Sequence, residues 1–414
     1  MIGSDLSAVP WLRADPLRRV LEVLNGAGEE TRIAGGAVRD GLLGRPVSDV
    51  DLATTAPPDE VMRRARAAGL KVIETGIAHG TVSVVSAGAA FEVTTLRQDV
   101  ETDGRHAVVR FGRDWTADAE RRDFTMNALY ATADGAVIDL VGGCADLAAA
   151  HVRFIGNAHA RIKEDHLRIL RLFRFHAGYG RGQMDAPALH AALQQRAGIE
   201  RLSRERVGRE VMKLLPLAGA PDTIRLMSET GFLAMSLGGV GHLAALDRLA
   251  RLERETGQPA CAVRRLAVLA VRISEDVDRL RARLRLSNDA HARLGALAVS
   301  DTLPSQGHQA RILTYLQGKM RTRDAILCAG ARADVPADRI APLMAQVDAW
   351  TVPALPVKAI DLVRLGLHPG PALGAALRRA ERAWISADFP KSEDDIAVIT
   401  RAAAHPAPGG VIGS

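Results

Sequence analysis

The sequence of 414 residues predicts an α+β fold, with a small mixed or antiparallel sheet and its helices followed by an all-helical region. Short β-branched runs between turn signals fill the chain up to about residue 150. From about residue 158, Leu, Ala and Arg recur at helical spacing. A chain of this length exceeds one ordinary core, so at least two domains are expected.

The first part of the chain begins with an amphipathic helix, which carries Leu17, Val20, Leu21 and Leu24 on one face. A strand at residues 31–34 then leads into a glycine pair. A helix is predicted for PPDEVMRRARAAG, and further strands are predicted for VSDVDLAT, KVIETG, TVSVVSA, AFEVTTLR and VIDLVGG.

The formal charge of +6 is concentrated in one segment. Residues 161–213 contain twelve Lys/Arg against six Asp/Glu, which favours a polyanionic partner such as RNA. The alternative is that these charges only solvate helix faces. Three isolated cysteines form no zinc pattern, and there is no long apolar run or secretion signal. A cytoplasmic protein without membrane association is expected.

The most informative motif joins Gly35-Gly36 with Asp49 and Asp51. A Gly-Gly turn lets backbone N–H groups approach a phosphate, and a helix starting near Ala37 adds its positive end. Two aspartates at positions i and i+2 of a strand face the same side, and Mg²⁺ prefers such carboxylates together with substrate phosphate. The alternative is a solvated D-x-D loop and a turn without a ligand.

Glu92, in the predicted strand AFEVTTLR, is the candidate for a third catalytic carboxylate. Metal-assisted phosphoryl transfer uses such acids, and one of them can also deprotonate an incoming hydroxyl. The alternative is an edge-strand glutamate that faces water.

The segment AERRDFTMNALY, residues 119–130, supplies Arg122, Asp123 and Asn127. Arginine suits phosphate, and Asp and Asn can bond sugar hydroxyls. Asp123 can equally be the N-cap of a helix over FTMNALYA.

The segment at residues 162–180 is predicted as a helix, with Asp165 and Arg168 on one face and Glu164 orienting Arg168. Arg171 and Arg174 continue the basic stripe. A carboxylate only accepts hydrogen bonds and a guanidinium only donates them. This pair would therefore bind cytosine and adenine and reject uracil and guanine. The alternative is a surface ion pair.

A further basic helix is predicted after Ser203. Its candidate RNA-binding residues are Arg204, Arg206, Arg209 and Lys213. The helix can equally serve only to buttress the first part of the chain.

Together, GGAVRD…DVD, FEVTTLR, RRDFTMNALY, EDHLRILRLFRF and RLSRERVGREVMKLL resemble, in this order, the class II tRNA nucleotidyltransferases. These are the CCA-adding enzymes and bacterial poly(A) polymerases, and the resemblance covers residues 33 to 215. It implies a polymerase-β-like nucleotidyltransferase head and then helical neck, body and tail. It also implies transfer of CMP and AMP from CTP and ATP to a tRNA 3′ end, with release of pyrophosphate.

The resemblance assigns roles to residues of this chain. It implies metal binding by Asp49 and Asp51, and a flexible loop at residues 98–118 that governs the switch from C to A addition. The nucleotide-binding positions expected on this basis and from the basic stripe are Gly35, Gly36, Arg39, Arg122, Asp123, Asn127, Glu164, Asp165, Arg168 and Arg171.

The expected division is a catalytic head at 1–150, a neck with the nucleotide-selecting helix at 151–220, a tRNA-binding body and tail at 221–405, and a flexible end at 406–414. No His-Asp dipeptide occurs, so no phosphohydrolase activity is expected. ETGIAHGTVSVV stands where the poly(A) polymerase branch shows a strongly basic strand, which favours CCA addition.

Other functions stay open at this point. They are a poly(A) polymerase, an enzyme that adds only C or only A, and an inactive RNA-binding protein. The chain can be a monomer or a homodimer.

Overall fold

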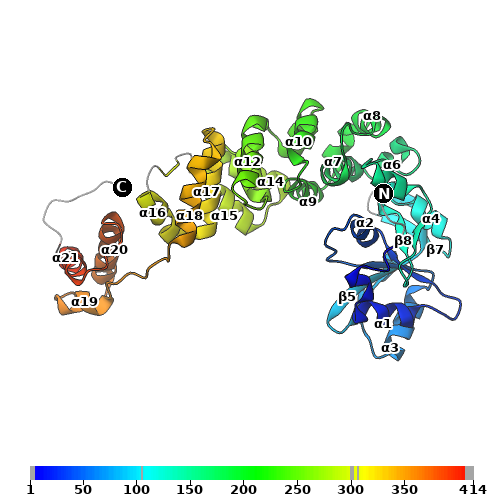
Figure 1. The fold of residues 1–414 in the computed structure, drawn as a ribbon, viewed down its shortest axis with the longest axis horizontal. Coiled ribbons are helices and arrows are strands. Elements are labelled where there is room, and N and C mark those ends of the chain that lie inside the picture. The colour runs from blue at the N-terminus through cyan, green and yellow to red at the C-terminus, as the bar shows by residue number, and fades with distance from the viewer. Residues whose placement is uncertain (1–4, 104–105, 299–302, 305–306, 406–414) are drawn as a thin grey trace. The chain divides into compact units, whose positions relative to one another are not determined.

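The computed structural model describes residues 5–103, 106–298, 303–304 and 307–405 (Figure 1). The chain divides into two compact units. The first unit comprises residues 1–243 and 279–286, and the second comprises residues 244–278 and 287–414. The predicted boundaries at residues 150 and 220 fall within the first unit, so the division into head, neck and body stays a prediction. The predicted flexible end at 406–414 lies outside the described residues.

The first unit contains a seven-stranded sheet in the order β3-β4-β5-β2-β1-β8-β9. All neighbouring strands are antiparallel except β2 and β5, which are parallel, so the predicted mixed sheet is confirmed. The strands are β1 (Thr31–Ala34), β2 (Asp51–Thr54), β3 (Lys71–Gly76), β4 (Thr81–Ser86), β5 (Ala89–Thr95), β8 (Leu129–Ala131) and β9 (Val137–Asp139).

Helices cover the sheet through the apolar faces that the sequence predicts. In α1 (Asp15–Leu24), the four residues predicted to face the core are all buried. The helix α3 (Pro58–Ala67) begins at a proline, whose missing N–H costs nothing in the first turn. The short α2 (Gly36–Leu42) follows directly from β1.

The alternative of a helix over FTMNALYA, with Asp123 as its N-cap, is wrong. Residues Thr125–Asn127 form only a 3-10 turn, η3, and the chain then enters strand β8. The reason is tertiary, because β8 pairs with β1 on one side and β9 on the other and fully buries Tyr130.

The segment expected to be a flexible loop, residues 98–118, has regular structure where it is described. A two-stranded ribbon is formed by β6 (Arg97–Asp103) and β7 (His106–Phe111), and α4 (Trp115–Glu120) follows. Residues 104–105, between the two strands, lie outside the described residues.

Helices continue the first unit after β9. They are α5 (Gly143–Ala148), α6 (Ala158–Glu164), α7 (Leu167–Tyr179), α8 (Ala186–Gln194), α9 (Arg204–Leu214), α10 (Ala220–Glu229) and α11 (Phe232–Leu237). The expected single helix over 162–180 is wrong, because Asp165 has extended backbone angles and separates α6 from α7. The carboxylate of Asp165 instead accepts the backbone N–H of Leu167 at the start of α7.

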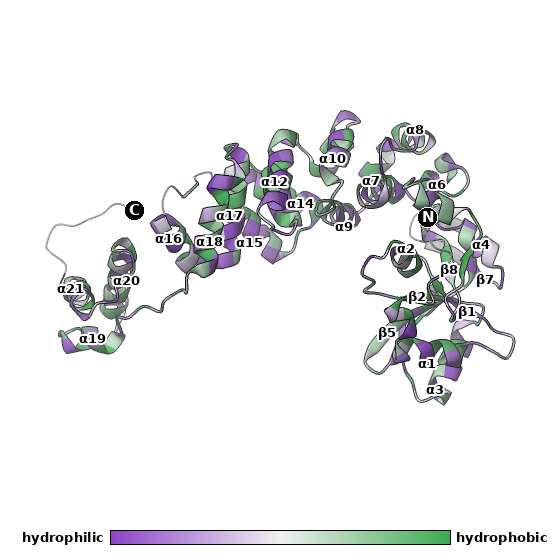
Figure 2. Cartoon of the chain, in the orientation of Figure 1, coloured by the Kyte–Doolittle hydropathy of each residue, from purple (hydrophilic) through white to green (hydrophobic). Residues whose placement is uncertain are grey.

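The remaining chain is helical, as predicted, and hydrophilic and hydrophobic residues alternate along its helices (Figure 2). These helices are α12 (Leu243–Glu255), α13 (Ala262–Ala270), α14 (Ser274–Leu284), α15 (Asn288–Ala298), α16 (Gly307–Gln317), α17 (Lys319–Arg332), α18 (Ala337–Ala349), α19 (Ala359–Arg364), α20 (Pro371–Ser386) and α21 (Glu393–Ala404). Within the described residues, none is long and apolar enough to span a membrane.

Candidate active site

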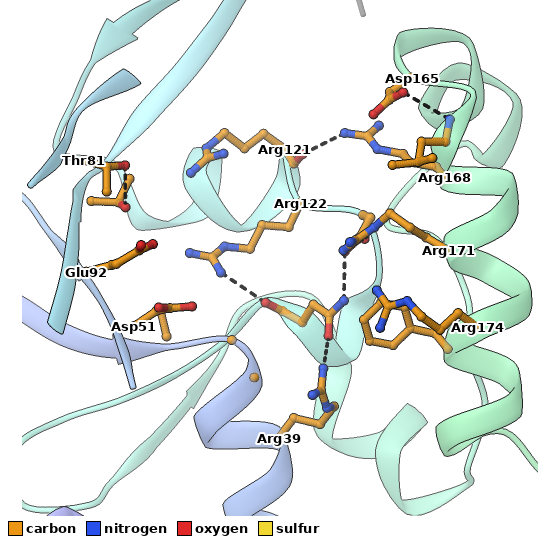
Figure 3. A pocket seen from close by; sticks show the side chains of 18 of the residues that line it. Arg39, Asp51, Thr81, Glu92, Arg121, Arg122, Asp165, Arg168, Arg171 and Arg174 are labelled. Atoms are coloured by element: carbon orange, nitrogen blue, oxygen red, sulfur yellow. Dashed lines mark hydrogen bonds and ion pairs between the residues drawn. The ribbon is translucent and has the colours of Figure 1, made fainter. Parts of the chain in front are cut away.

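A cavity of about 620 Å³ opens in the first unit between the sheet and α7 (Figure 3). Carboxylates and threonines line it on the sheet side, and arginines line it on the other. The polar residues of its wall are Arg39, Asp51, Thr81, Glu92, Thr94, Arg97, Arg121, Arg122, Asp123, Asn127, Asp165, Arg168, Arg171, Arg174 and Arg206. A space of this size suits a small organic ligand.

Asp51 and Glu92 form the acidic side of the cavity. Because β2 and β5 run parallel with Leu52 beside Val93, the two preceding residues are neighbours, and both carboxylates point into the cavity (Figure 3). The pKa of Asp51 is raised, first by partial enclosure and then by the charges of Glu92 and Asp49. The positive charge of Arg122 acts in the opposite direction and lowers this pKa. Neither Asp51 nor Glu92 forms an ion pair with a described residue.

Asp49 lies outside the strand that was predicted to carry it. The strand β2 begins at Asp51, and Asp49 is exposed in the preceding segment, where it accepts a 3.1 Å hydrogen bond from Ser48. It does not line the cavity, although its charge acts on Asp51. Among the described residues, no three His, Cys, Asp or Glu side chains are arranged to hold a metal by themselves.

The glycine turn forms the floor beside these acids. Gly35 has a φ of 69°, and a Cβ there would lie 3.2 Å from Nη1 of Arg122 and 3.3 Å from the carbonyl oxygen of Asn127. A side chain at this position would therefore be strained and would crowd Arg122. Gly35 and Gly36 both line the cavity, as the sequence predicts.

Arg121 and Arg122 are anchored by a residue that the sequence analysis did not single out. Asp118 is only 1% exposed and accepts bonds from Arg121 at 2.5 Å, Arg122 at 3.1 Å and the Tyr130 hydroxyl at 2.7 Å. Burial alone would raise the pKa of Asp118, but Arg121 and Arg122 outweigh it and lower that pKa. In the sequence, Asp118 precedes Arg121 and Arg122 by one helical turn, and this spacing is the feature that could have indicated the contact.

Asp123 and Asn127 join the glycine-turn side of the cavity to α7. Arg39 donates to Asn127 Oδ1 at 2.5 Å, and Asn127 donates to Asp123 Oδ1 at 2.9 Å. Asp123 Oδ2 accepts Nε of Arg171 at 2.7 Å. Asp123 is therefore no helix N-cap, and its second oxygen is occupied by an arginine of α7.

Asp165 and Arg168 both reach the cavity, and each has its own partner. Arg206 of α9 donates to Asp165 at 2.6 Å, and Glu164 forms an ion pair with Arg168. Arg168 also donates to the carbonyl oxygen of Arg161 at 2.8 Å. Glu164 does not line the cavity, and its ion pair with Arg168 is the contact through which the sequence predicts it to act.

The basic helix α9 contributes less to the cavity than its four candidate residues suggest. Only Arg206 lines it, whereas Arg204, Arg209 and Lys213 are exposed. Cavity residues that were not selected as site residues from the sequence are Ala34, Leu52, Thr81, Thr94, Arg97, Arg121, Leu167, Arg174 and Phe175. Arg174 pairs with Glu210 of α9 at 2.5 Å.

Comparison with known proteins extends these observations. Residues 31–153 match the family described as the poly A polymerase head domain. The mitochondrial CCA tRNA nucleotidyltransferase 1 of Mus musculus is 33% identical over 396 residues, which cover 93% of this chain and 89% of the relative. The chain belongs to the CCA tRNA nucleotidyltransferase family. It is therefore a nucleotidyltransferase, and the resemblance noted from its motifs is confirmed.

Bacterial members of the CCA tRNA nucleotidyltransferase family are similarly related. A CCA-adding enzyme of Latilactobacillus sakei is 31% identical over 384 residues, which cover 91% of this chain and 94% of the relative. A crystal structure of the Bacillus stearothermophilus CCA-adding enzyme in complex with CTP matches with a TM-score of 0.72 and 28% identity. That match covers 93% of this chain and 96% of the other, so the predicted fold is confirmed over both units.

Proposed function

We propose that this chain adds C, C and A to tRNA 3′ ends from CTP and ATP, without a nucleic-acid template. The observation that carries the proposal is the cavity, in which two carboxylates without an ion pair to any described residue face a wall of arginines. This arrangement suits a triphosphate between a cation site and guanidinium groups. The CTP complex of the related Bacillus stearothermophilus enzyme supports the same assignment.

The donor chemistry of the acidic side fits Mg²⁺. The pKa of Asp51 is raised first by partial enclosure and then by the charges of Glu92 and Asp49, and a bound cation would offset both effects. Asp49 and Asp51 would hold the ion, the substrate phosphates would complete its shell, and Glu92 would remain free as the third acid. When bound, Mg²⁺ supplies neutralisation of phosphate charge and activation of the attacking hydroxyl.

The reaction that follows for the chain's own residues is a single displacement. The 3′ oxygen of the tRNA forms a bond to the α-phosphorus, and the bond from this phosphorus to pyrophosphate breaks. Glu92, which has no ion pair within the described chain, accepts the proton of the hydroxyl. Arg121 and Arg122 bind the departing pyrophosphate, because Asp118 already fixes their guanidinium groups.

Base selection is assigned to Asp165 and Arg168. Cytosine and adenine each present an amino donor beside a ring-nitrogen acceptor, which match the carboxylate and the guanidinium. Uracil and guanine present the reverse pattern and would leave buried polar groups unpaired. The partners Arg206 and Glu164 support this assignment, because they restrict the two reading groups to one orientation.

The variant Arg168→Ala tests base selection directly. We expect it to lose most of the preference for CTP and ATP, and unchanged incorporation of all four nucleotides would contradict the assignment. Arg181→Ala is the matched control, because Arg181 is exposed and does not line the cavity.

The exposed residues Arg204, Arg209 and Lys213 are proposed to contact tRNA phosphates. The head at 1–150, the neck at 151–220 and the tRNA-binding body and tail at 221–405 complete this proposal. A cytoplasmic location is proposed on the three cysteines, none of which is in a disulfide.

The activity itself is tested with tRNA that lacks its last three nucleotides. CTP alone should add two residues, and both nucleotides together should add three and then stop. Unlimited A addition from ATP alone would favour a poly(A) polymerase, and a product ending after C or containing only A would favour a partial enzyme. If no pyrophosphate is released, the remaining hypothesis is an inactive RNA-binding protein.

A further inference from the structure

The last residue of α7, Tyr179, contacts α2 from outside the cavity wall. Its hydroxyl donates to Asp40 Oδ1 at 3.0 Å. The guanidinium carbons of Arg39 and Arg45 lie 4.2 Å and 4.6 Å from its ring centre. Arg45 also donates to the carbonyl oxygen of Gly178 at 3.0 Å. These contacts join the end of α7 to α2 and the segment that follows it.

Asp40 connects this contact to the cavity through Arg39. Asp40 accepts Nε of Arg39 at 3.0 Å and Nη2 at 2.8 Å, and Nη1 donates to Asn127. All three guanidinium nitrogens of Arg39 are therefore engaged, and the residue is only 7% exposed. Arg39 lines the cavity, whereas Asp40, Arg45 and Tyr179 do not.

The two helices that Tyr179 joins have different tasks in the proposed reaction. The helix α2 begins at the glycine turn, on the triphosphate side of the cavity. The helix α7 carries Arg168, Arg171 and Arg174 along the opposite wall (Figure 3). One nucleotide must reach both sides at once, so their separation decides whether a base can be read while its α-phosphate is in place.

We propose that Asp40, Arg45 and Tyr179 form a clasp that sets the separation between the triphosphate side and the base-reading side of the cavity. The three are positioning residues, because they act through Arg39 and through the end of α7. The inference rests on the proposed function, since it concerns how one nucleotide is held between the triphosphate side and the base-reading side. An opened clasp would weaken discrimination more than it weakens nucleotide binding.

The variants Tyr179→Phe and Tyr179→Ala separate the hydroxyl from the ring. Tyr179→Phe keeps the ring contacts, so we expect the ratio of kcat/KM for CTP over UTP to fall about threefold. Tyr179→Ala removes both, and a fall of about tenfold or more is expected, since small misplacements have large kinetic effects. The matched control is Tyr315→Phe, which removes a 2.8 Å bond from a tyrosine to Glu381 in the second unit and should leave the ratio unchanged.

A double-mutant cycle tests whether the Tyr179 hydroxyl acts through Asp40. If Tyr179 acts through Asp40, the variant Asp40→Asn with Tyr179→Phe should have a CTP/UTP ratio close to that of Asp40→Asn alone. Additive losses would contradict the clasp. A ratio within twofold of the wild type in both Tyr179 variants would overturn it, as would an equal loss in Tyr315→Phe.

Hydrogen exchange provides a readout that does not depend on base selection. Tyr179→Ala should speed amide exchange in residues 36–42 of the folded protein, and Tyr315→Phe should not. A wild-type enzyme without preference among the four nucleotides would disprove the proposed base selection, while faster exchange in α2 would still uphold the clasp. A selective wild type with unchanged exchange and selectivity in Tyr179→Ala would disprove the clasp alone.

Discussion

Asp51 and Glu92 have no ion pair with any described residue, although the cavity is rich in arginine, because other carboxylates pair with most of the arginines. Asp118 holds two of them, and Asp123 and Glu164 hold one arginine of α7 each. The remaining pairs are Asp40 with Arg39, Glu210 with Arg174 and Asp165 with Arg206. This pairing keeps the guanidinium groups in place and leaves the acidic side available for a cation.

The partial enclosure of Asp51, together with the charges of Glu92 and Asp49, has a consequence for stability. Its raised pKa means that the ionised carboxylate destabilises the folded chain at any pH above that pKa. The destabilisation is relieved as the pH falls through the raised pKa and the group takes up a proton. A bound divalent cation would relieve it at neutral pH.

Asp51→Asn should therefore separate activity from stability. We expect nucleotide addition to fall by at least about 100-fold, as when one group that stabilises transition-state charge is removed. In EDTA at neutral pH, the melting temperature should stay equal to that of the wild type or rise. Primer extension on trimmed tRNA and calorimetry check the two expectations.

The control for this change is Asp59→Asn, in the exposed first turn of α3. It removes a charge that favours a helix N-terminus, so a slight loss of stability with full activity is expected. A clear drop in the melting temperature of Asp51→Asn without metal would contradict the account of its pKa.

Helices, strands and turns could be predicted where the local spacing of apolar residues and glycines alone determines them. The three buried leucines and the valine of α1, the strand β1 and the glycine turn follow from spacing alone. The segment after Asp123 was not predictable in this way, because its residues suit a helix and only pairing with β1 makes them a strand. The break at Asp165 likewise depends on Arg206, which lies 41 residues further along the chain.

In the candidate site, too, some residues could be predicted from local sequence and others only from the fold. Charged residues in recognisable motifs were identified, and most of them line the cavity. Thr81 and Thr94 were missed because their position depends on the register of β4 and β5, where the two are directly paired. Asp118 was missed because its spacing to two arginines is common on exposed helices, and only the fold buries it.

The break between α6 and α7 allows a test of how precisely Asp165 and Arg168, the proposed base-reading pair, must be positioned. Gly198, in the 3-10 helix Arg196–Arg201, is buried, and a Cβ there would lie 1.8 Å from Cδ2 of His166. His166 stands directly between Asp165 and α7. Any side chain at residue 198 must therefore displace the ring and disturb the break.

Gly198→Ala should cost about 1–3 kcal/mol of stability through overpacking. It should also reduce discrimination between CTP and UTP, because Asp165 and Arg168 flank the displaced ring. Denaturant unfolding and single-nucleotide incorporation measure the two effects. Gly295→Ala in α15 is the control, since a Cβ there meets nothing within 4 Å and should stabilise the helix by up to about 1 kcal/mol. Full discrimination in Gly198→Ala would show that the break tolerates movement of His166.

The molecule as a whole divides its charged interactions between two units. The cavity and the pairs that support it belong to the first unit. The second unit has a separate buried cluster, in which Arg264 donates to Glu253 at 2.7 Å and to Asp324 at 2.9 Å. Arg293 donates to the other oxygen of Asp324 at 2.6 Å. Because Asp324 is only 3% exposed, its loss would leave Arg293 without its carboxylate partner and Arg264 with Glu253 alone.

Asp324→Ala should therefore destabilise the second unit by about 3–5 kcal/mol, the usual consequence of removing one member of a buried ion pair. Asp348→Ala is the control, because its pair with Arg323 is partly exposed and should contribute less than about 1 kcal/mol. CTP should still raise the melting temperature of the first unit in Asp324→Ala, since a ligand stabilises the unit that binds it. Calorimetry with and without CTP measures both effects, and loss of the CTP-induced shift in Asp324→Ala would show that the cavity depends on the integrity of the second unit.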